Sequence, residues 1–387
     1  MGSVILEKGS SSSPKWCEIW KTLTVRWLVS TLRSVTTICL RCLSAPLSTL
    51  RCRLMSLKNR ILIQDSRMRS KRIKYLLVTL ILLYILYIFF GIGDYVQSKS
   101  FDENFDYPLS IDIKPLVREV LSGKRSSVKP INYYPYRFLT NSGKCSTADK
   151  IDLFIVVKSA MDHFEHRMAI RHTYGQEDIT PGHVTKILFF LGTRGRKTEI
   201  QTKIEAEMVR YKDIIQIDYI DTYYNNTIKT VMSLRWLFEH CSMADFYLFT
   251  DDDMYISVPN LLEYVETATI NGSTITPKNL FYSGYMFKSG PHRIIGSKWR
   301  VGLDEYPWNK WPPYITAGAY VLSNQAMKVL YVASLFVKHF RFDDIYLGIV
   351  AKKAGIVPAH CDRFYFHKKR YSKEGYRDVI ASHGYGN

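Results

Sequence analysis

Three consecutive aspartates, Asp251-Asp252-Asp253, are the sharpest chemical feature of the sequence. They directly follow the apolar run Phe246–Phe249, which is typical of a buried strand. Three adjacent carboxylates repel one another when they are ionised, unless a cation lies between them. Mn²⁺ and Mg²⁺ take carboxylate oxygens and commonly share their coordination sphere with substrate phosphates. We therefore predict a divalent-cation site at the end of this strand, with a solvated acidic turn as the alternative.

Two pairs of charged residues could complete such a site. Arg167 and Arg171 are four residues apart, so in a helix they share a face and could hold a phosphate. An exposed basic helix face is the alternative. Asp343 and Asp344 open a predicted helix over residues 345–353. Acids at this position either cap the helix or supply a general base that faces the metal site.

A histidine and a group of aromatic residues extend the set of candidates. His367 precedes Lys368, Lys369 and Arg370, so its imidazole could complete a metal shell while the cations hold a diphosphate. His360 competes for this role. Aromatic rings could cover the C–H faces of sugars or simply pack in the core. The aromatic candidates are Trp299, Tyr306, Trp308, Trp311 and Tyr314.

Strand-like and helix-like segments alternate from residue 151 onward. Near-continuous apolar runs predict buried strands at residues 151–157, 186–192, 213–220 and 245–250, and further strands near 281–287 and 319–322. Helices are predicted at residues 227–240, 325–340 and 345–353. This alternation favours an α/β fold with a mostly parallel sheet flanked by helices, in which ligands bind at the carboxyl ends of the strands.

Residues 75–93 form a stretch of 19 residues without a charge. At about 1.5 Å per residue such a helix spans roughly 28 Å, close to the hydrocarbon thickness of a bilayer, and a buried core helix is the alternative. Basic residues precede the stretch and acids follow it, so the positive-inside rule puts the C-terminal part in a lumen or outside the cell. The expected parts are a basic cytoplasmic tail (1–74), a signal-anchor helix (75–93), a stem (94–150) and a catalytic domain (151–387).

The formal charge of +18 lies mostly on the tail. Residues 1–74 hold 15 Lys and Arg against 3 Asp and Glu, whereas residues 75–387 hold 38 against 32. The globular part is therefore only mildly basic, which argues against a nucleic-acid-binding protein. We interpret the tail as a disordered segment, or as sequence upstream of a true start at Met55 or Met68. A basic amphipathic helix on the anionic leaflet is the alternative.

Cysteines and glycosylation sequons fit this division of the chain. Cys145, Cys241 and Cys361 would lie in an oxidising compartment, where three single pairings are open and the sequence does not choose among them. Asn225 and Asn271 each begin a sequon and are the candidate glycosylation sites.

Several motifs occur in an order that resembles the β1,3-galactosyltransferase family (glycosyltransferase family 31), type II membrane enzymes of the Golgi. The similar segments are Arg167–Tyr174 (R-x-x-I-R-x-T-W), Asp221–Thr230 (D-x-Y-x-N-L-T-L-K-T), Asp251–Asp253 (DDD), Trp311–Ser323 (Y-P-P-Y…G-x-G-Y-V-x-S) and Asp343–Gly348 (E-D-V-Y-x-G). The departures are Tyr174 for Trp, Asn226 for Leu, Ala319 at a small or Gly position and Asp343 for Glu. The resemblance covers residues 150–370 or so.

The resemblance implies a GT-A-like fold and inverting, metal-dependent transfer of galactose from UDP-galactose to the 3-hydroxyl of a glycan on glycolipid or glycoprotein. It implies Asp344 as the general base. Mn²⁺ (or Mg²⁺) would be held by Asp253, Asp251 and His367. Donor-binding residues would be Arg167, Arg171, Asp252 and Lys229. Acceptor-binding residues would be Trp299, Trp311, Tyr314 and Asp343.

Two alternatives stay open at this point. The same fold could transfer N-acetylglucosamine or N-acetylgalactosamine, or the chain could be a catalytically inactive sugar-binding relative. The expected partners are a UDP-sugar, a glycan acceptor and the Golgi membrane, without nucleic acid, and a homodimer also stays open.

Overall fold

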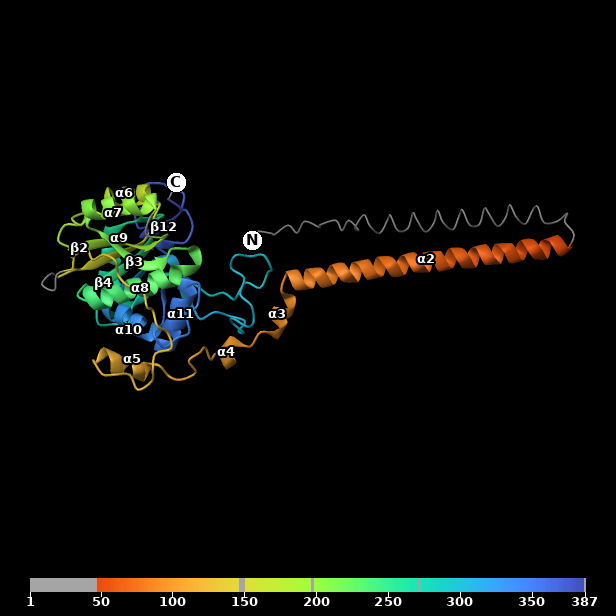
Figure 1. Cartoon of the computed structure of the whole chain (residues 1–387), viewed down its shortest axis with the longest axis horizontal. Helices are drawn as coiled ribbons and strands as arrows, with labels where there is room; N and C mark the ends of the chain where they lie inside the picture. Colours follow the sequence, from red (N-terminus) through yellow and green to blue (C-terminus); the bar gives the residue numbers. More distant parts are fainter. Residues whose placement is uncertain (1–46, 146–149, 196–197, 271, 386–387) are drawn as a thin grey trace, which may run out of the picture. The chain divides into compact units, whose positions relative to one another are not determined.

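The structure, a computed structural model, describes residues 47–145, 150–195, 198–270 and 272–385. The chain divides into two units, Met1–Tyr87 and Ile88–Asn387. The described residues of the first unit belong to helix α2, Leu47–Phe89 (Figure 1). Its stretch Met55–Phe89 is long and apolar enough to cross a membrane, and it is the one such helix in the part of the chain that the structure describes.

The apolar helix ends at Phe89, before the predicted boundary at residue 93. Gly91 has a φ of +64°, a conformation that other residues rarely adopt. A Cβ atom at Gly91 would lie 2.5 Å from the backbone oxygen of Arg293. The chain therefore turns at this glycine and continues into the short helix α3, Ile92–Gln97.

A seven-stranded sheet forms the centre of the second unit, in the order β10-β8-β9-β4-β1-β2-β3. Strands β3, β2, β1 and β4 are parallel, whereas β9 runs antiparallel to both of its neighbours. The strands are β1 (Leu153–Lys158), β2 (Thr185–Thr193), β3 (Ile214–Ile220), β4 (Phe246–Asp251), β8 (Tyr282–Phe287), β9 (Tyr314–Ser323) and β10 (Ala359–His360). Two smaller sheets consist of β11 (Phe364–Tyr365), β12 (Ala381–His383) and β5 (Met254–Ile256), and of β6 (Thr269–Ile270) and β7 (Ser273–Thr274).

Helices cover both faces of the large sheet (Figure 1). One face packs against α5 (Lys114–Leu121), α8 (Asn226–His240), α10 (Asn324–Ser334) and α11 (Asp343–Ala354). The other face packs against α6 (Phe164–Arg171), α7 (Glu199–Tyr211) and α9 (Val258–Thr267). The short helices α4 (Phe101–Asn104) and η1 (Tyr223–Asn225) lie in connecting segments.

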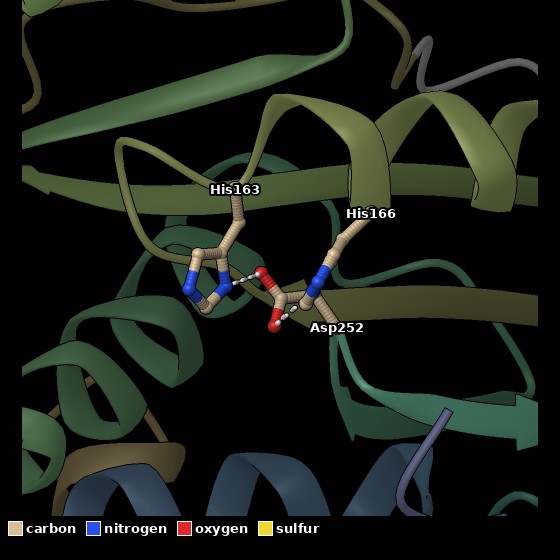
Figure 2. Close-up of side chains that lie close together, drawn as sticks. All are labelled: His163, His166 and Asp252. Carbon is tan, nitrogen blue, oxygen red and sulfur yellow. Dashed lines mark hydrogen bonds and ion pairs between the residues drawn. The ribbon is translucent and has the colours of Figure 1, made fainter. Parts of the chain in front are cut away.

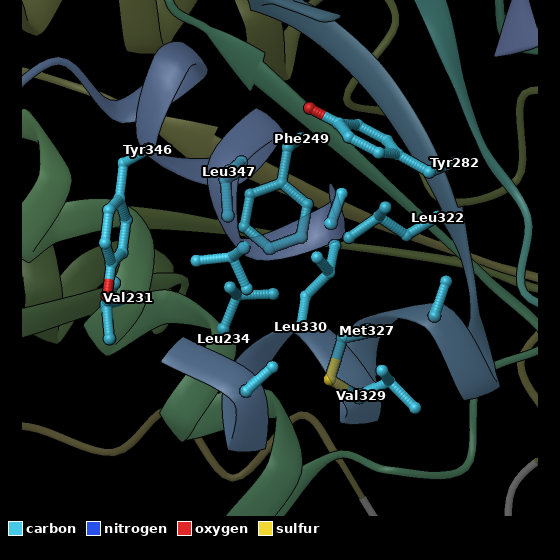
Figure 3. Packing of buried hydrophobic residues seen from close by; sticks show 14 of the residues in the cluster. Val231, Leu234, Phe249, Tyr282, Leu322, Met327, Val329, Leu330, Tyr346 and Leu347 are labelled. Atoms are coloured by element: carbon cyan, nitrogen blue, oxygen red, sulfur yellow. The ribbon is translucent and has the colours of Figure 1, made fainter. Parts of the chain in front are cut away.

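Side chains of the central strands alternate between two hydrophobic cores. In β1, Phe154 and Val156 belong to one core, whereas Ile155 and Val157 belong to the other. Figure 3 shows the first core, in which Phe249 of β4 lies among side chains from α8, α10 and α11. Because both faces are buried, these strands read in the sequence as unbroken apolar runs.

The segment between α2 and β1 packs onto the sheet-containing unit over much of its length. The backbone nitrogen of Lys99 donates to Pro307 O at 2.8 Å, and that of Leu139 donates to Gln216 O at 2.8 Å. Leu116 is 4% exposed and belongs to the first core. The predicted stem is thus part of the folded second unit over much of its length.

One disulfide, Cys145–Cys241, joins the end of this stem segment to the end of α8. Cys361 is a buried free thiol. The structure therefore selects one of the three pairings that the sequence left open.

The predicted α/β class is confirmed, with the GT-A-like arrangement of a mostly parallel sheet between helices. The predicted helix at residues 325–340 is shorter than expected, since α10 ends at Ser334. The carbonyl oxygen of Ser334 accepts hydrogen bonds from Asn132 Nδ2 at 2.7 Å and from the Tyr346 hydroxyl at 2.8 Å. These two side chains pair a backbone carbonyl group that a further turn of helix would otherwise pair, so the helix can end at Ser334.

Candidate active site

The acidic triad, Asp251–Asp253, lies at the carboxyl end of β4 in the middle of the large sheet. Asp251 is paired in register with Lys158, the last residue of β1. The Nζ atom of Lys158 lies 3.0 Å from Asp251 Oδ1 and 2.9 Å from Asp343 Oδ2. Burial raises the pKa of Asp251 to about 6, although the Lys158 ammonium opposes this effect. One buried lysine therefore links the triad to the start of α11.

The two aspartates that begin α11 have different environments. Asp343 is buried, and its pKa is lowered because the charge of Lys158 and the hydrogen bonds from Lys158 and Thr230 outweigh the effect of burial. Burial and the neighbouring Asp343 carboxylate raise the pKa of Asp344 to about 7. Asp344 lines the larger pocket described below, where it could accept a proton near neutral pH.

Asp253 has a histidine partner that the sequence analysis missed. His383 Nε2 lies 3.1 Å from Asp253 Oδ2, because β12 pairs antiparallel with β5 directly after the triad. The other carboxylate oxygen, Asp253 Oδ1, is buried and has no hydrogen-bond partner among the described residues. Their hydrogen bond raises the pKa of His383 and, against the effect of burial, lowers that of Asp253. An unpaired carboxylate oxygen beside an imidazole fits a divalent cation.

His367 does not lie with the triad in any described contact. Its ring packs edge-on against Phe366 at 4.9 Å between centroids, and its backbone oxygen accepts a hydrogen bond from Ser382. The metal-ligand role of His367 therefore stays a prediction, and His383 is the histidine that the structure places beside the triad. The only signal in the sequence was an isolated histidine in a short C-terminal segment, which does not identify a ligand by itself.

Asp252 points toward the start of α6, where two histidines flank its carboxylate (Figure 2). His163 Nδ1 lies 2.9 Å from Asp252 Oδ2, and His166 Nδ1 lies 3.6 Å from Asp252 Oδ1. The backbone nitrogen of Ala160 also donates to Asp252 Oδ2 at 3.3 Å. The three acids of the triad thus have three different sets of neighbours.

Arg167 and Arg171 form ion pairs inside the folded unit, and neither lines one of the two pockets described below. Arg167 is fully buried and donates to both carboxylate oxygens of Glu207, at 2.9 and 2.7 Å. Arg171 donates to both oxygens of Asp213, at 2.7 and 2.8 Å, and to Glu207 at 2.7 Å. These guanidinium groups are occupied between α6, α7 and the start of β3, so their position gives the donor-binding role no support, and that role stays a prediction.

Two pockets that share part of their lining lie around the triad. The smaller, about 380 Å³, is lined by all three aspartates together with Lys158, His163, Arg194 and Lys229. The larger, about 510 Å³, is lined by Asp344, His383 and many aromatic side chains. Tyr223, Asn226 and Asp251 line both pockets. A polar ligand in the smaller pocket and a second ligand in the larger one would therefore meet beside Asp251.

Lys229, a predicted donor-binding residue, is buried at the wall of the smaller pocket. Its Nζ atom donates to Ser159 O at 2.7 Å and lies 3.0 Å from Asp221 Oδ1. Its charge is thus already paired, and it contributes to the pocket mainly by fixing the segment that carries Ser159.

The predicted acceptor residues divide into exposed and buried ones. Trp299 is 46% exposed and its indole donates to the Tyr223 hydroxyl at 3.1 Å. Tyr314 is half-buried and stacks on Phe287 with ring centroids 5.8 Å apart. Trp311 lines the larger pocket, but it is 4% exposed and packs in the core.

The acceptor-binding role predicted for Asp343 stays a prediction. Although Asp343 lines the larger pocket, its carboxylate is held by Lys158 and Thr230. These partners already occupy Asp343 Oδ2, so this oxygen is held in place beside the neighbouring Asp344.

The two predicted glycosylation sites have different outcomes. Asn225 Nδ2 donates to Ile220 O at 2.8 Å, and the sequon residue Thr227 is fully buried. The neighbouring Asn226 lines both pockets, so a glycan on Asn225 would stand beside them. Asn271 lies outside the described residues.

Comparisons with known proteins agree with this geometry. A family model described as Galactosyltransferase matches residues 165–362. The beta-1,3-galactosyltransferase brn of Drosophila melanogaster is 36% identical over 325 residues, which cover 83% of this chain and 95% of that protein. The lactosylceramide 1,3-N-acetyl-beta-D-glucosaminyltransferase of Mus musculus is 32% identical over 329 residues, covering 82% and 84%. Beta-1,3-galactosyltransferase 1 of Mus musculus is 32% identical over 255 residues, covering 66% and 76%.

Proposed function

Since the chain belongs to the galactosyltransferase family and is a glycosyltransferase, we propose that it is an inverting β1,3-hexosyltransferase. It moves galactose from UDP-galactose to the 3-hydroxyl of a glycan on glycolipid or glycoprotein. The observation that carries this proposal is the position of Asp344, whose pKa is raised to about 7, in a pocket that shares Asp251 with the pocket of the acidic triad.

Asp253 and His383, with Asp251 nearby, are the residues that would hold Mn²⁺ or Mg²⁺. The unpaired oxygen of Asp253 supports this assignment, because a buried carboxylate oxygen without a partner is unfavourable unless a cation binds it. When bound, such a cation neutralises the diphosphate of the departing nucleotide. In the absence of the cation, the hydrogen bond between Asp253 and His383 keeps both side chains in place.

Asp344 is the proposed general base. Its carboxylate accepts the proton of the acceptor hydroxyl while that oxygen attacks the anomeric carbon from the face opposite the leaving group, which inverts the configuration. Asp343 and Lys158 position it, because their ion pair fixes the start of α11. Direct displacement requires no covalent enzyme intermediate.

The two pockets have different proposed ligands. The smaller pocket binds the nucleotide diphosphate, with Asp252 and the cationic Arg194 at its wall. The larger pocket binds the acceptor, with Trp299 and Tyr314 as the aromatic surfaces that cover the C–H faces of its sugar. Trp311 supports this surface from the core.

The N-terminal apolar helix supports a single-pass membrane anchor. We propose a type II orientation in the Golgi membrane, with the basic tail in the cytoplasm and the catalytic unit in the lumen. The Cys145–Cys241 disulfide supports an oxidising compartment for that unit.

A panel of donors tests the proposed reaction. The full-length chain in detergent is incubated with Mn²⁺, an acceptor panel with terminal galactose, N-acetylglucosamine or mannose, and one of three donors: UDP-galactose, UDP-N-acetylglucosamine or UDP-N-acetylgalactosamine. We expect galactose transfer with a β1,3 linkage, assigned by NMR of the product. Sugar binding without transfer from any donor would contradict the proposal and favour an inactive sugar-binding protein.

N-acetylglucosamine transfer is the second candidate. It is favoured by the likeness to the mouse lactosylceramide enzyme, which transfers that sugar according to its name. Glycolipid and glycoprotein acceptors in the same panel distinguish the acceptor classes.

A further inference from the structure

The proposed reaction does not use the two histidines beside Asp252, of which His163 lines the smaller pocket. His163 immediately precedes α6 and His166 lies within its first turn, so both rings project from the same end of the helix toward the triad (Figure 2). We propose that His163, His166 and Asp252 form a binding site for a zinc-class transition-metal ion, separate from the position between Asp253 and His383. This inference concerns metal binding and does not depend on the proposed reaction.

The ligand atoms already have the spacing that a small ion needs. One atom from each side chain lies within 4.8 Å of the other two. In a tetrahedral zinc site, with metal–ligand bonds of about 2.0–2.2 Å, neighbouring ligand atoms are about 3.3 Å apart. The distances from the Asp252 oxygens to the two Nδ1 atoms, 2.9 Å for His163 and 3.6 Å for His166, lie on either side of that value.

Hydrogen bonding accounts for only one of the two histidines. The 2.9 Å contact of His163 with Asp252 is an ordinary hydrogen bond. His166 Nδ1, in contrast, is buried and has no hydrogen-bond partner among the described residues. A buried ring nitrogen that faces a carboxylate at 3.6 Å has a free lone pair or an unused proton, and a metal ion would satisfy it.

The charge of the surroundings also favours a cation. Asp251 and Asp253 line the smaller pocket together with Asp252. The cations of that pocket are each already paired with an aspartate, namely Lys158, Lys229 and Arg194. A dication at Asp252 would therefore reduce the repulsion among the acids.

The donor set predicts which ion binds. Two imidazole nitrogens and one carboxylate suit Zn²⁺, Co²⁺ or Ni²⁺, whereas Mg²⁺ and Mn²⁺ prefer sites rich in oxygen. Three protein ligands leave the fourth position of a tetrahedral ion open for water or another ligand, and two of them, His163 and Asp252, line the smaller pocket. The site thus differs from the Asp253–His383 position in both ligands and preferred metal.

Zinc titration of the full-length chain tests this proposal. The protein is purified in detergent, stripped of metal with EDTA, and its free cysteines are blocked with iodoacetamide so that thiolates do not contribute. Isothermal titration calorimetry with Zn²⁺ is then compared for wild type, for His163→Ala/His166→Ala and for His383→Ala. His172→Ala is the matched control, since this exposed histidine directly follows α6.

We expect one zinc ion to bind per chain, with the same affinity, in wild type, His383→Ala and His172→Ala. In His163→Ala/His166→Ala the affinity for this ion should fall at least about tenfold. Equal zinc binding by the double variant and wild type would overturn the proposal. The proposal would also be overturned if His383→Ala lost this zinc ion while the double variant kept it. Thermal unfolding in metal-free buffer checks that each variant is folded. If the double variant is not folded, the single variant His163→Ala replaces it, because the ring of His163 is partly exposed. Unchanged zinc affinity in His163→Ala would then overturn the proposal.

Discussion

Asp344 has a raised pKa, as a general base that works near neutral pH needs, whereas the pKa of its neighbour Asp343 is lowered. Burial and the adjacent carboxylate raise the pKa of Asp344 to about 7, whereas Lys158 keeps the pKa of Asp343 below its usual range. Two neighbouring acids with pKa values pushed apart are typical of a division into a base and a positioning charge. The exchange of Glu for Asp at position 343 therefore leaves the assignment of the base at 344 intact.

The pH dependence of transfer follows from this raised pKa. A protonated Asp344 cannot accept a proton, so kcat/KM should rise about tenfold per pH unit below pH 7 and level off above it. A divalent cation nearby would move this rise to lower pH, but it should stay well above 4, the usual value for an aspartate. A rate that does not change between pH 5 and 8 would contradict this role.

At the scale of elements, Gly348 allows α11 to lie close to β9. A Cβ atom at this position would be 2.5 Å from the Cβ of Tyr314 and 3.2 Å from Pro313 O. Neither atom is the end of a flexible side chain, so the helix would have to move. Because Asp344 is one turn earlier on the same helix, its position depends on this contact.

Gly348→Ala should therefore lower both stability and turnover. We expect a loss of about 1–3 kcal/mol in the free energy of unfolding, from overpacking against Tyr314, together with a decrease in kcat. Lys352→Ala, an exposed position on the same helix, is the control and should change neither. Wild-type stability and kcat in Gly348→Ala would show that the helix does not depend on this contact.

The arginines of α6 are predicted to matter for stability rather than for donor binding. Arg167→Leu leaves Glu207 buried with only part of its charge compensated, so the free energy of unfolding should fall by about 3–5 kcal/mol. Lys203→Met removes an exposed ion pair and should cost less than about 1 kcal/mol. Chemical denaturation measures both free energies. A stable Arg167→Leu variant with a raised KM for the donor would instead support the donor-binding role.

The central strands could be predicted from the sequence because they are buried on both faces. The run at residues 245–250 corresponds to β4, and the run at 151–157 corresponds closely to β1. In contrast, β5 and β12 are only three residues long and pair across more than 120 residues of chain, so no local pattern identifies them. His383 was missed for this reason, since only that pairing brings it to Asp253.

The charged residues of the site show the same limit. Asp251–Asp253 and Asp344 could be recognised because they follow a strand or begin a helix. The role of Arg167 could not, because its partner Glu207 lies in α7, a helix that the sequence analysis did not predict. Residue type and spacing identify a charge, but only the packing of distant elements determines whether that charge is free to bind a ligand.

At the scale of the whole molecule, one disulfide closes a long loop around the first half of the catalytic unit. Cys145 and Cys241 are 96 residues apart in sequence, and the enclosed segment contains β1, β2, β3 and α8. A disulfide that encloses so long a loop strongly reduces the conformational entropy of the unfolded chain.

Removal of this disulfide should destabilise the protein by about 2–5 kcal/mol. The double variant Cys145→Ser/Cys241→Ser should have a lower Tm than wild type, and dithiothreitol should lower the Tm of wild type only. Because the double variant lacks this disulfide, its Tm with and without dithiothreitol is the control for other effects of the reductant. An unchanged Tm of wild type under reducing conditions would contradict a stabilising role.

The most direct test of the account compares donor binding with sugar transfer in the same preparations of the full-length chain. With Mn²⁺ present, Asp344→Asn should bind UDP as wild type does, while its transfer rate falls by about 10²- to 10⁴-fold. Asp253→Asn should lose the Mn²⁺-dependent part of UDP binding itself. Near-normal transfer by Asp344→Asn, or Mn²⁺-dependent UDP binding that survives in Asp253→Asn, would contradict the roles given to the base and to the acidic triad.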